Sequence, residues 1–306
     1  MGKVAIDRML LDAVAHYGAG RAMEAGTLCG DILSADPDHI PALHLSAVIA
    51  FVTDRAAEGA VLLNRVFSLD PQHGPAFGTL GDALAVKGEH EGAVAAFQRG
   101  VMLRPKDAGL HIKLGVALCD LSRFDEAEAA FRRAIALDGG LTRARFNLAV
   151  ALAGQQRPVE AEQAYREVIA RDPAYRGVWL NLGNALTDQK KHDAAVTAYR
   201  RGLGLDPDNP GLHGGLGAAL YRLGRLEDAT GHFAVIQPSL TGELDISGDG
   251  ARHRRGRSHG PPQTVAGIFY HISPANLAAP SRRSLLLKFP AIGDRLPSRQ
   301  IPSRIK

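Results

Sequence analysis

The chain has 306 residues and a formal net charge of +4 at pH 7, but this charge is not spread evenly. Residues 241–306 hold 11 Lys/Arg and 4 Asp/Glu, a net charge of +7, whereas residues 1–240 hold 25 and 28, a net charge of −3. These values exclude a strongly basic surface for nucleic acid over most of the chain, and the presence of only two cysteines excludes a disulfide framework.

The first twenty residues contain no recognisable targeting signal. Asp7 and Asp12 interrupt the apolar run that a signal peptide requires. Ile6 stands where a myristoylation site needs Ser or Thr. No stretch approaches about 18 consecutive apolar residues, the length that predicts a membrane span. With Cys29 and Cys119 as its two cysteines, we expect a chain of the reducing cytoplasm that makes no membrane contact.

From residue 6 onward the sequence repeats with a period of 34 residues. A proline or glycine recurs at this spacing, at Pro37, Pro71, Pro105, Gly139, Pro173 and Pro207. With this residue at position 32, the repeats begin near Ile6, Ile40, Gly74, Ala108, Thr142, Arg176 and Pro210. Position 8 is Gly or Ala in all seven repeats, and position 7 is Leu in the last five. A fixed period of this length predicts a repeat architecture.

Each repeat is predicted to form two amphipathic helices joined by a short turn, because apolar residues recur at spacings of three and four within each half. Gly88 and Gly224 lie in the turn, where a residue with positive φ closes a helix. The proline at position 32 ends the second helix. Small residues at positions 8 and 20 let the two helices approach closely beside the large residue at position 24. Gly202 is less well explained by this pattern, and Gly204 matches no position of it.

The sixth repeat resembles the tetratricopeptide repeat. Its residues Trp179, Leu182, Gly183, Leu186, Ala195, Tyr199 and Pro207 match the residue types of that signature. The resemblance extends from residue 6 to about residue 240 and implies one all-α domain over residues 1–240. That domain would be a right-handed α-solenoid of about seven 34-residue helix-turn-helix repeats, which bury each other's apolar faces. Repeats one and two depart from the signature, since Asp12 and Ser46 occupy position 7, where Leu is usual.

No catalytic or metal-binding motif is found in the sequence. His111 and His213 both occupy position 4, where the sixth repeat has Trp179, and this favours a structural role for them. No Cys or His pair has the spacing of a zinc site. The glycine-rich segment Gly214–Leu220 lacks the Lys and Ser/Thr of a phosphate-binding loop. We therefore expect a chain that is not an enzyme and that needs no metal, cofactor or small-molecule substrate.

The resemblance also implies a concave groove lined by the first helix of each repeat. Positions 6 and 9 tend to face this groove, and they supply Asp82, Lys113, Asn147, Asn181 and Asn184. Asn147 and Asn181 resemble the asparagine ladder in the repeat domain of O-linked N-acetylglucosamine transferases, which implies binding of a peptide main chain. Lys113 and Asp82 would favour a ligand that carries both signs of charge. The alternative is that all these side chains form an ordinary solvated helix face. Position 5 lacks the Lys of the clamp that binds chaperone C-termini, so a co-chaperone role is not expected.

From Thr241 the 34-residue pattern stops, and the tail of residues 241–306 carries seven prolines. The basic run "RHRRGRSHGPPQ" is typical of disordered segments. Two apolar pieces, Thr264–Ile272 and Arg282–Phe289, are candidates to cap the open end of the repeat array. An unselected extension of the chain is a further interpretation of this composition.

The sequence therefore predicts a non-catalytic scaffold that binds a protein or peptide partner in its concave groove. One alternative is the targeting region of a glycosyltransferase-like enzyme whose catalytic domain is absent. The 66-residue tail is too short to fold such a domain, which argues against a complete enzyme. A second alternative is nucleic-acid contact through the basic tail.

Overall fold

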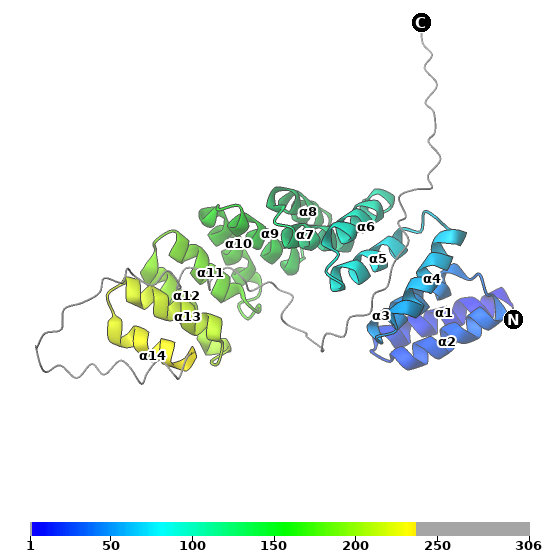
Figure 1. Cartoon of the computed structure of the whole chain (residues 1–306), viewed down its shortest axis with the longest axis horizontal. Coiled ribbons are helices and arrows are strands. Elements are labelled where there is room, and N and C mark those ends of the chain that lie inside the picture. The colour runs from blue at the N-terminus through cyan, green and yellow to red at the C-terminus, as the bar shows by residue number, and fades with distance from the viewer. Residues whose placement is uncertain (1, 237–306) are drawn as a thin grey trace, which may run out of the picture. The chain divides into compact units, whose positions relative to one another are not determined.

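The computed structural model describes residues 2–236, and every regular element in that range is an α-helix (Figure 1). The predictions for the tail of residues 241–306 lie outside the described residues. Within the described residues the chain divides into two compact units, the first ending at Pro71 and the second beginning at Gln72. That all seven repeats form one continuous superhelix over residues 1–240 stays a prediction.

The first unit holds two pairs of helices and the second holds five. The first unit contains α1 (Lys3–Gly18), α2 (Ala22–Ala35), α3 (Ile40–Val52) and α4 (Ala56–Leu69). The second contains α5 (Gly74–Val86), α6 (His90–Leu103), α7 (Ala108–Asp120), α8 (Phe124–Leu137), α9 (Thr142–Gly154), α10 (Pro158–Arg171), α11 (Val178–Asp188), α12 (His192–Leu205), α13 (Pro210–Arg222) and α14 (Leu226–Ile236). Each predicted repeat is thus one helix pair, and α3, α5, α7, α9 and α13 begin at the predicted residue.

The turn inside every pair uses the same left-handed backbone conformation. Position 15 has positive φ in all seven repeats, at Gly20, Asp54, Gly88, Ser122, Gln156, Lys190 and Gly224. This conformation stops the first helix and reverses the chain. At the other end of a pair, Asp36 before Pro37 has φ −140° and ψ 90°, the extended backbone favoured before proline. Asp138 has nearly the same φ and ψ before Gly139, so proline helps to end the second helix but is not required.

The glycines at position 8 give space to the aromatic residue at position 24 of the same repeat. A Cβ atom added to Gly115 would lie 2.5 Å from Phe131 Cε1, and one added to Gly217 would lie 2.7 Å from Phe233 Cε1. Gly183 bears the same relation to Tyr199. Contacts this short cannot be accommodated in a close-packed core. The predicted purpose of the small residues at position 8 is therefore confirmed.

Side chains at position 4 tie the loop between repeats to the following helix. Trp179 Nε1 donates to the Pro173 carbonyl at 2.8 Å, and Arg145 donates to the Gly139 carbonyl at 2.6 Å. His111 Nε2 lies 3.1 Å from the Pro105 carbonyl, and His213 Nε2 lies 2.8 Å from the Pro207 carbonyl. A carbonyl only accepts, so both histidines donate from Nε2. The structural role predicted for His111 and His213 is thus a hydrogen bond as well as packing.

The first helices of the second unit lie against one another in succession, and this defines one face of the unit. Within this unit the second helix of each repeat packs on the first helix of the next, as α6 does on α7 and α8 on α9. In addition α5 contacts α7, α7 contacts α9, α9 contacts α11 and α11 contacts α13, whereas no two second helices of this unit are in contact. The first helices are therefore closer together than the second helices, and we call the side of the unit that they form the inner face. Figure 1 labels these helices as α5, α7, α9, α11 and α13.

Candidate functional site

The candidate site is this inner face, made by α5, α7, α9, α11 and α13 of the second unit. Positions 6 and 9 are three residues apart on a helix and therefore share one side of it. Lys113, Asn147 and Asn181 at position 6 are half-buried, while Asp82 and Asn184 at position 9 are exposed. The structure thus places all five predicted residues on the first helices with accessible side chains, and their role in binding stays a prediction.

Asp82 and Lys113 form an ion pair that joins α5 to α7. Lys113 Nζ lies 2.5 Å from Asp82 Oδ2, and the two side chains are 41% and 50% exposed. Exposed pairs of this kind add little to stability, about 0–1 kcal/mol. The pair does matter for recognition, because the two charges neutralise each other. A ligand that carries both signs of charge would have to compete with this ion pair. The sequence pattern did not predict the pair.

Asn184 is held in one orientation by a residue from the core. The Tyr199 hydroxyl, on α12, donates to Asn184 Oδ1 at 2.8 Å, and only 2% of Tyr199 is exposed. With Oδ1 accepting this bond, the amide nitrogen of Asn184 is directed away from Tyr199 and makes no hydrogen bond to any described residue. Asn184 therefore presents a donor on the inner face.

Two glycines make this contact possible, and sequence reasoning did not connect them with the site. The Tyr199 ring passes between Gly183 on α11 and Gly215 on α13, and a Cβ added to Gly215 would lie 2.5 Å from Tyr199 Cε1. Gly215 occupies position 6, where the preceding three repeats have Lys or Asn. A glycine at an otherwise polar position, together with Tyr in place of Phe at position 24, is the signal that would have indicated the contact.

Asn181 differs from Asn184 in that its side-chain oxygen is free to accept. Its Nδ2 atom donates to the carbonyl of Gly177, one turn earlier, at 2.9 Å. The side-chain oxygen of Asn181 therefore stays available as an acceptor for a ligand, and the amide nitrogen keeps its second N–H as a donor. Asn147 makes no hydrogen bond to another described residue, so both its groups are available. Across the three asparagines the face offers donors and acceptors side by side.

An aromatic group lies beside these asparagines. Phe146 at position 5 of α9 packs on Tyr175, with ring centroids 5.0 Å apart, and on Tyr165, with centroids 5.8 Å apart. Phe146 and Tyr175 are half-buried, so some of their apolar surface remains accessible next to Asn147. Burial raises the pKa of the Tyr175 hydroxyl, and a nearby Arg143 partly offsets this. The hydroxyl is neutral at physiological pH.

Groups that could support catalysis are few among residues 2–236. No cluster of three or more His, Cys, Asp or Glu that could hold a metal ion is found there. Cys29 and Cys119 are both unpaired thiols. Burial, with a smaller contribution from Asp120, raises the pKa of Cys119 to about 12. Burial also raises the pKa of Cys29, so neither thiol is an activated nucleophile. None of the described helices is both long enough and apolar enough to cross a bilayer.

Family models place known repeats in the second unit. Models described as tetratricopeptide repeat match residues 112–176 and 152–202, and one described as TPR repeat matches residues 183–224. Residues 112–224 therefore contain tetratricopeptide repeats, as the residues of the sixth repeat predicted. No curated protein matches the chain. The more specific resemblance to O-linked N-acetylglucosamine transferases is not shown by these matches.

Solved structures of similar fold cover most of the helical region. PilW, a type IV pilus biogenesis factor, matches with a TM-score of 0.62 at 16% identity over 69% of this chain and 98% of PilW. PilF of Pseudomonas aeruginosa matches with a TM-score of 0.61 at 16% identity over 68% and 95%. YrrB, described as a TPR protein with an unusual peptide-binding site, matches with a TM-score of 0.54 at 18% identity over 60% and 95%. At these identities the likeness shows the fold alone, a helical solenoid of the tetratricopeptide type.

Proposed function

We propose that this chain is a non-catalytic scaffold that binds an extended segment of a protein partner on the inner face of α5, α7, α9, α11 and α13. The observation that carries the proposal is the arrangement on α11, where Asn181 presents an acceptor and Tyr199 orients Asn184 to present a donor. The peptide-binding site named for YrrB, a protein of the same fold, supports this proposal. We also propose a cytoplasmic location, as expected for a chain with two unpaired cysteines.

The chemistry of the face suits the main chain of a peptide. Each residue of an extended peptide offers one N–H donor and one carbonyl acceptor. Asn181 Oδ1 would accept from an N–H, and the Asn184 amide nitrogen would donate to a carbonyl. Asn147, one repeat earlier, would extend the same contacts along the strand, which advances about 3.3 Å per residue. Phe146 and Tyr175 would contact an apolar side chain of the ligand. Such a face would bind mainly through hydrogen bonds to the peptide main chain, with a smaller contribution from the ligand's side chains.

The two alternatives from the sequence lack a comparable observation. The glycosyltransferase-like alternative assigns catalysis to a domain outside this chain, so the helix pairs of the described residues do not distinguish it from a scaffold. Nucleic-acid contact through the basic tail falls outside the described residues. Both therefore stay predictions.

The proposal is tested with a peptide selected from a random twelve-residue display library against the full chain. Each neutral hydrogen bond contributes about 0.5–1.5 kcal/mol, so Asn184→Ala should weaken binding of that peptide about two- to ten-fold. The double variant Asn147→Ala, Asn181→Ala should weaken it by several-fold to about a hundred-fold. Tyr199→Phe should reproduce most of the Asn184→Ala effect, because it removes only the hydroxyl that orients Asn184.

Asn64→Ala provides the matched control. Asn64 is an exposed asparagine on α4, in the other unit, and its substitution should leave the affinity unchanged. The helical signal in circular dichroism should be the same for all variants. Equal affinities of the wild type, Asn184→Ala and the double variant would overturn the proposal and identify these asparagines as a solvated helix face.

A further inference from the structure

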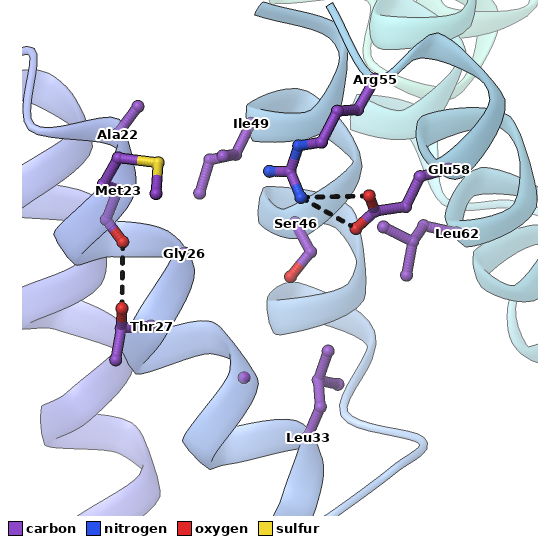
Figure 2. Close-up of a pocket in the computed structure, with 11 residues that line it drawn as sticks. Ala22, Met23, Gly26, Thr27, Leu33, Ser46, Ile49, Arg55, Glu58 and Leu62 are labelled. Carbon is purple, nitrogen blue, oxygen red and sulfur yellow. Dashed lines mark hydrogen bonds and ion pairs between the residues drawn. The ribbon is translucent and has the colours of Figure 1, made fainter. Parts of the chain in front are cut away.

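The first unit contains a pocket on the side of its second helices, away from the first-helix face. It has a volume of about 370 Å³ and lies between α2 and α4, with α3 as its floor (Figure 2). We call it the α2–α4 pocket, and it is lined by Ala22, Met23, Gly26, Thr27, Gly30, Leu33, Ser46, Ile49, Arg55, Glu58 and Leu62. Its size falls within the range of about 300–1,000 Å³ that is usual for ligand-sized clefts.

Three departures from the repeat pattern lie in the lining of this pocket. Gly26 and Gly30 are one turn apart on α2 and expose helix backbone to it, and Ser46 stands at position 7, where the last five repeats have Leu. The equivalent hollow between α8 and α10 has a similar volume of about 340 Å³, and its lining combines Ile135, Leu148 and Leu152 with four charged side chains, Arg132, Arg145, Glu160 and Glu167. The α2–α4 pocket thus has fewer charged side chains in its lining, because Arg55 and Glu58 are its two charged residues.

The surroundings of the pocket are acidic. Residues 1–71 hold 5 Lys/Arg and 9 Asp/Glu, a net charge of −4, whereas residues 72–236 hold 20 and 19, a net charge of +1. The one cation of the lining, Arg55, is already paired with Glu58 at 3.0 Å, as Figure 2 shows. The first unit is therefore the one with a net negative charge, and an occupant with apolar and basic groups would complement it.

One segment of the chain has this chemistry. Residues 282–289 read "RRSLLLKF", with three consecutive leucines flanked by three cations. The other apolar piece of the tail, Thr264–Ile272, contains no Asp, Glu, Lys or Arg. Charge complementarity therefore selects Arg282–Phe289 over Thr264–Ile272. The 45 residues between Ile236 and Arg282 can extend to about 150 Å, so chain length does not prevent the contact.

We propose that the α2–α4 pocket binds Arg282–Phe289 of this chain's own tail. The leucine side chains enter between Met23, Leu33, Ile49 and Leu62, while the flanking cations face the acidic first unit. Met23 lies at the rim and is 74% exposed, and its flexible side chain can adapt to cover an entering leucine. The contact assigns the tail a docking role that is separate from the peptide-binding face of the second unit.

The test uses a fluorescein-labelled peptide of residues 280–291 and the full chain carrying Leu285→Ser, Leu286→Ser and Leu287→Ser. These three substitutions prevent the chain's own segment from competing for the pocket. Fluorescence anisotropy should show that the peptide binds this chain, and that it binds the unsubstituted chain more weakly. Adding Gly30→Leu should weaken binding at least ten-fold, because a leucine there fills the pocket. A Cβ at Gly30 meets no atom within 4 Å, so the fold tolerates this change.

Gly204→Leu is the matched control. Gly204 is also an exposed helix glycine whose added Cβ meets nothing within 4 Å, but it lies on α12, in the second unit. Binding should be unchanged by Gly204→Leu and should weaken as salt is raised, since charges contribute to it. Failure of the peptide to bind overturns the proposal. Binding that Gly30→Leu does not affect also overturns it and would place the segment elsewhere, for example on the end of the array at α14.

Discussion

Gly183 and Gly204 lie on the neighbouring helices α11 and α12, yet a side chain would meet different surroundings at each. A Cβ on Gly183 would collide with the Tyr199 ring, whereas a Cβ on Gly204 meets no atom within 4 Å. We expect Gly183→Ala to destabilise the protein by about 1–3 kcal/mol through overpacking. Gly204→Ala should stabilise it by up to about 1 kcal/mol, because Gly204 lies in the exposed last turn of α12 and alanine has a higher helix propensity than glycine. Urea unfolding followed by circular dichroism measures both shifts.

The same pair of substitutions separates two explanations of glycine in these helices. If glycine served only to loosen the helices, both changes to alanine would stabilise the protein. Gly202 belongs with Gly183, since a Cβ there would lie 2.6 Å from Leu212 Cδ2. A destabilising Gly204→Ala, or a neutral Gly183→Ala, would contradict the packing explanation.

At the scale of helices, buried carboxylates join consecutive repeats. Glu162 on α10 accepts from Gln189 Nε2 at 2.8 Å and from Lys191 Nζ at 3.0 Å, both in the turn that follows α11. Only 9% of Glu162 is exposed. Glu128 has the same role in the preceding repeat, with Gln155 and Arg157 as donors. These bonds help to fix the orientation of one repeat on the next. The stability of a repeat protein depends on such interfaces between neighbouring repeats.

We expect Glu162→Ala to destabilise the second unit by about 1–3 kcal/mol, because it removes a charged acceptor, only 9% exposed, that is shared by Gln189, Lys191 and Arg166. Glu160→Ala is the control on the same helix. Glu160 pairs with Arg157 at the surface and should contribute about 0–1 kcal/mol. Midpoints of urea unfolding compare the two variants. An equal loss in both would show that the buried position of Glu162 has no special weight.

The last described helix, α14, is joined to α13 by a contact that depends on pH. His213 Nε2 donates to the Pro207 carbonyl, so neutral His213 accepts at Nδ1, and His232 Nδ1, 3.0 Å away, must donate to it. A proton on both rings would remove the acceptor and place two cations together. Burial, followed by His213 and Arg200, lowers the pKa of His232, and Asp228 opposes this only weakly.

A lowered histidine pKa gives a definite sign to the pH dependence. The contribution of His232 to stability is present above the ordinary histidine pKa and is lost as the pH falls through its lowered value. We expect the thermal midpoint to fall between pH 7.5 and pH 5.0, and to fall less in His232→Asn, whose amide can still donate to His213. Calorimetry at both values measures this difference. The same decrease in wild type and variant would show that the histidine pair does not control α14.

At the scale of the whole molecule, the sequence predicted what depends on periodicity and missed what depends on contacts between helices. The 34-residue spacing predicted the helix pairs and the turns between them. The resemblance to the tetratricopeptide repeat implied which positions face the groove, and the role of those residues in binding stays a prediction. It did not predict that Lys113 would pair with Asp82, 31 residues away, or that Tyr199 would orient Asn184. Those bonds depend on the side-chain rotamers that the two partners adopt once neighbouring helices have packed together. The α2–α4 pocket was not predicted because its lining includes small residues at three separate positions of the repeat pattern, Gly26, Gly30 and Ser46.

The distribution of charge leads to a prediction for the tail as a partner of nucleic acid. The run at residues 252–257 contains four arginines, and the rest of the chain is close to neutral or acidic. Four phosphate contacts give a salt slope of about −3.6 on duplex DNA, which corresponds to roughly a hundred-fold loss of affinity between about 50 and 200 mM salt. We expect a 30-base-pair duplex of arbitrary sequence to follow this slope with the full chain.

The substitutions Arg252→Gln, Arg254→Gln, Arg255→Gln and Arg257→Gln should abolish binding without changing the helical signal. Binding that persists at 200 mM salt, or that survives these four substitutions, would mean that the helical repeats themselves contact the duplex. Anisotropy of a labelled duplex over a salt series distinguishes the two, because charge neutralisation alone cannot produce a salt-independent affinity.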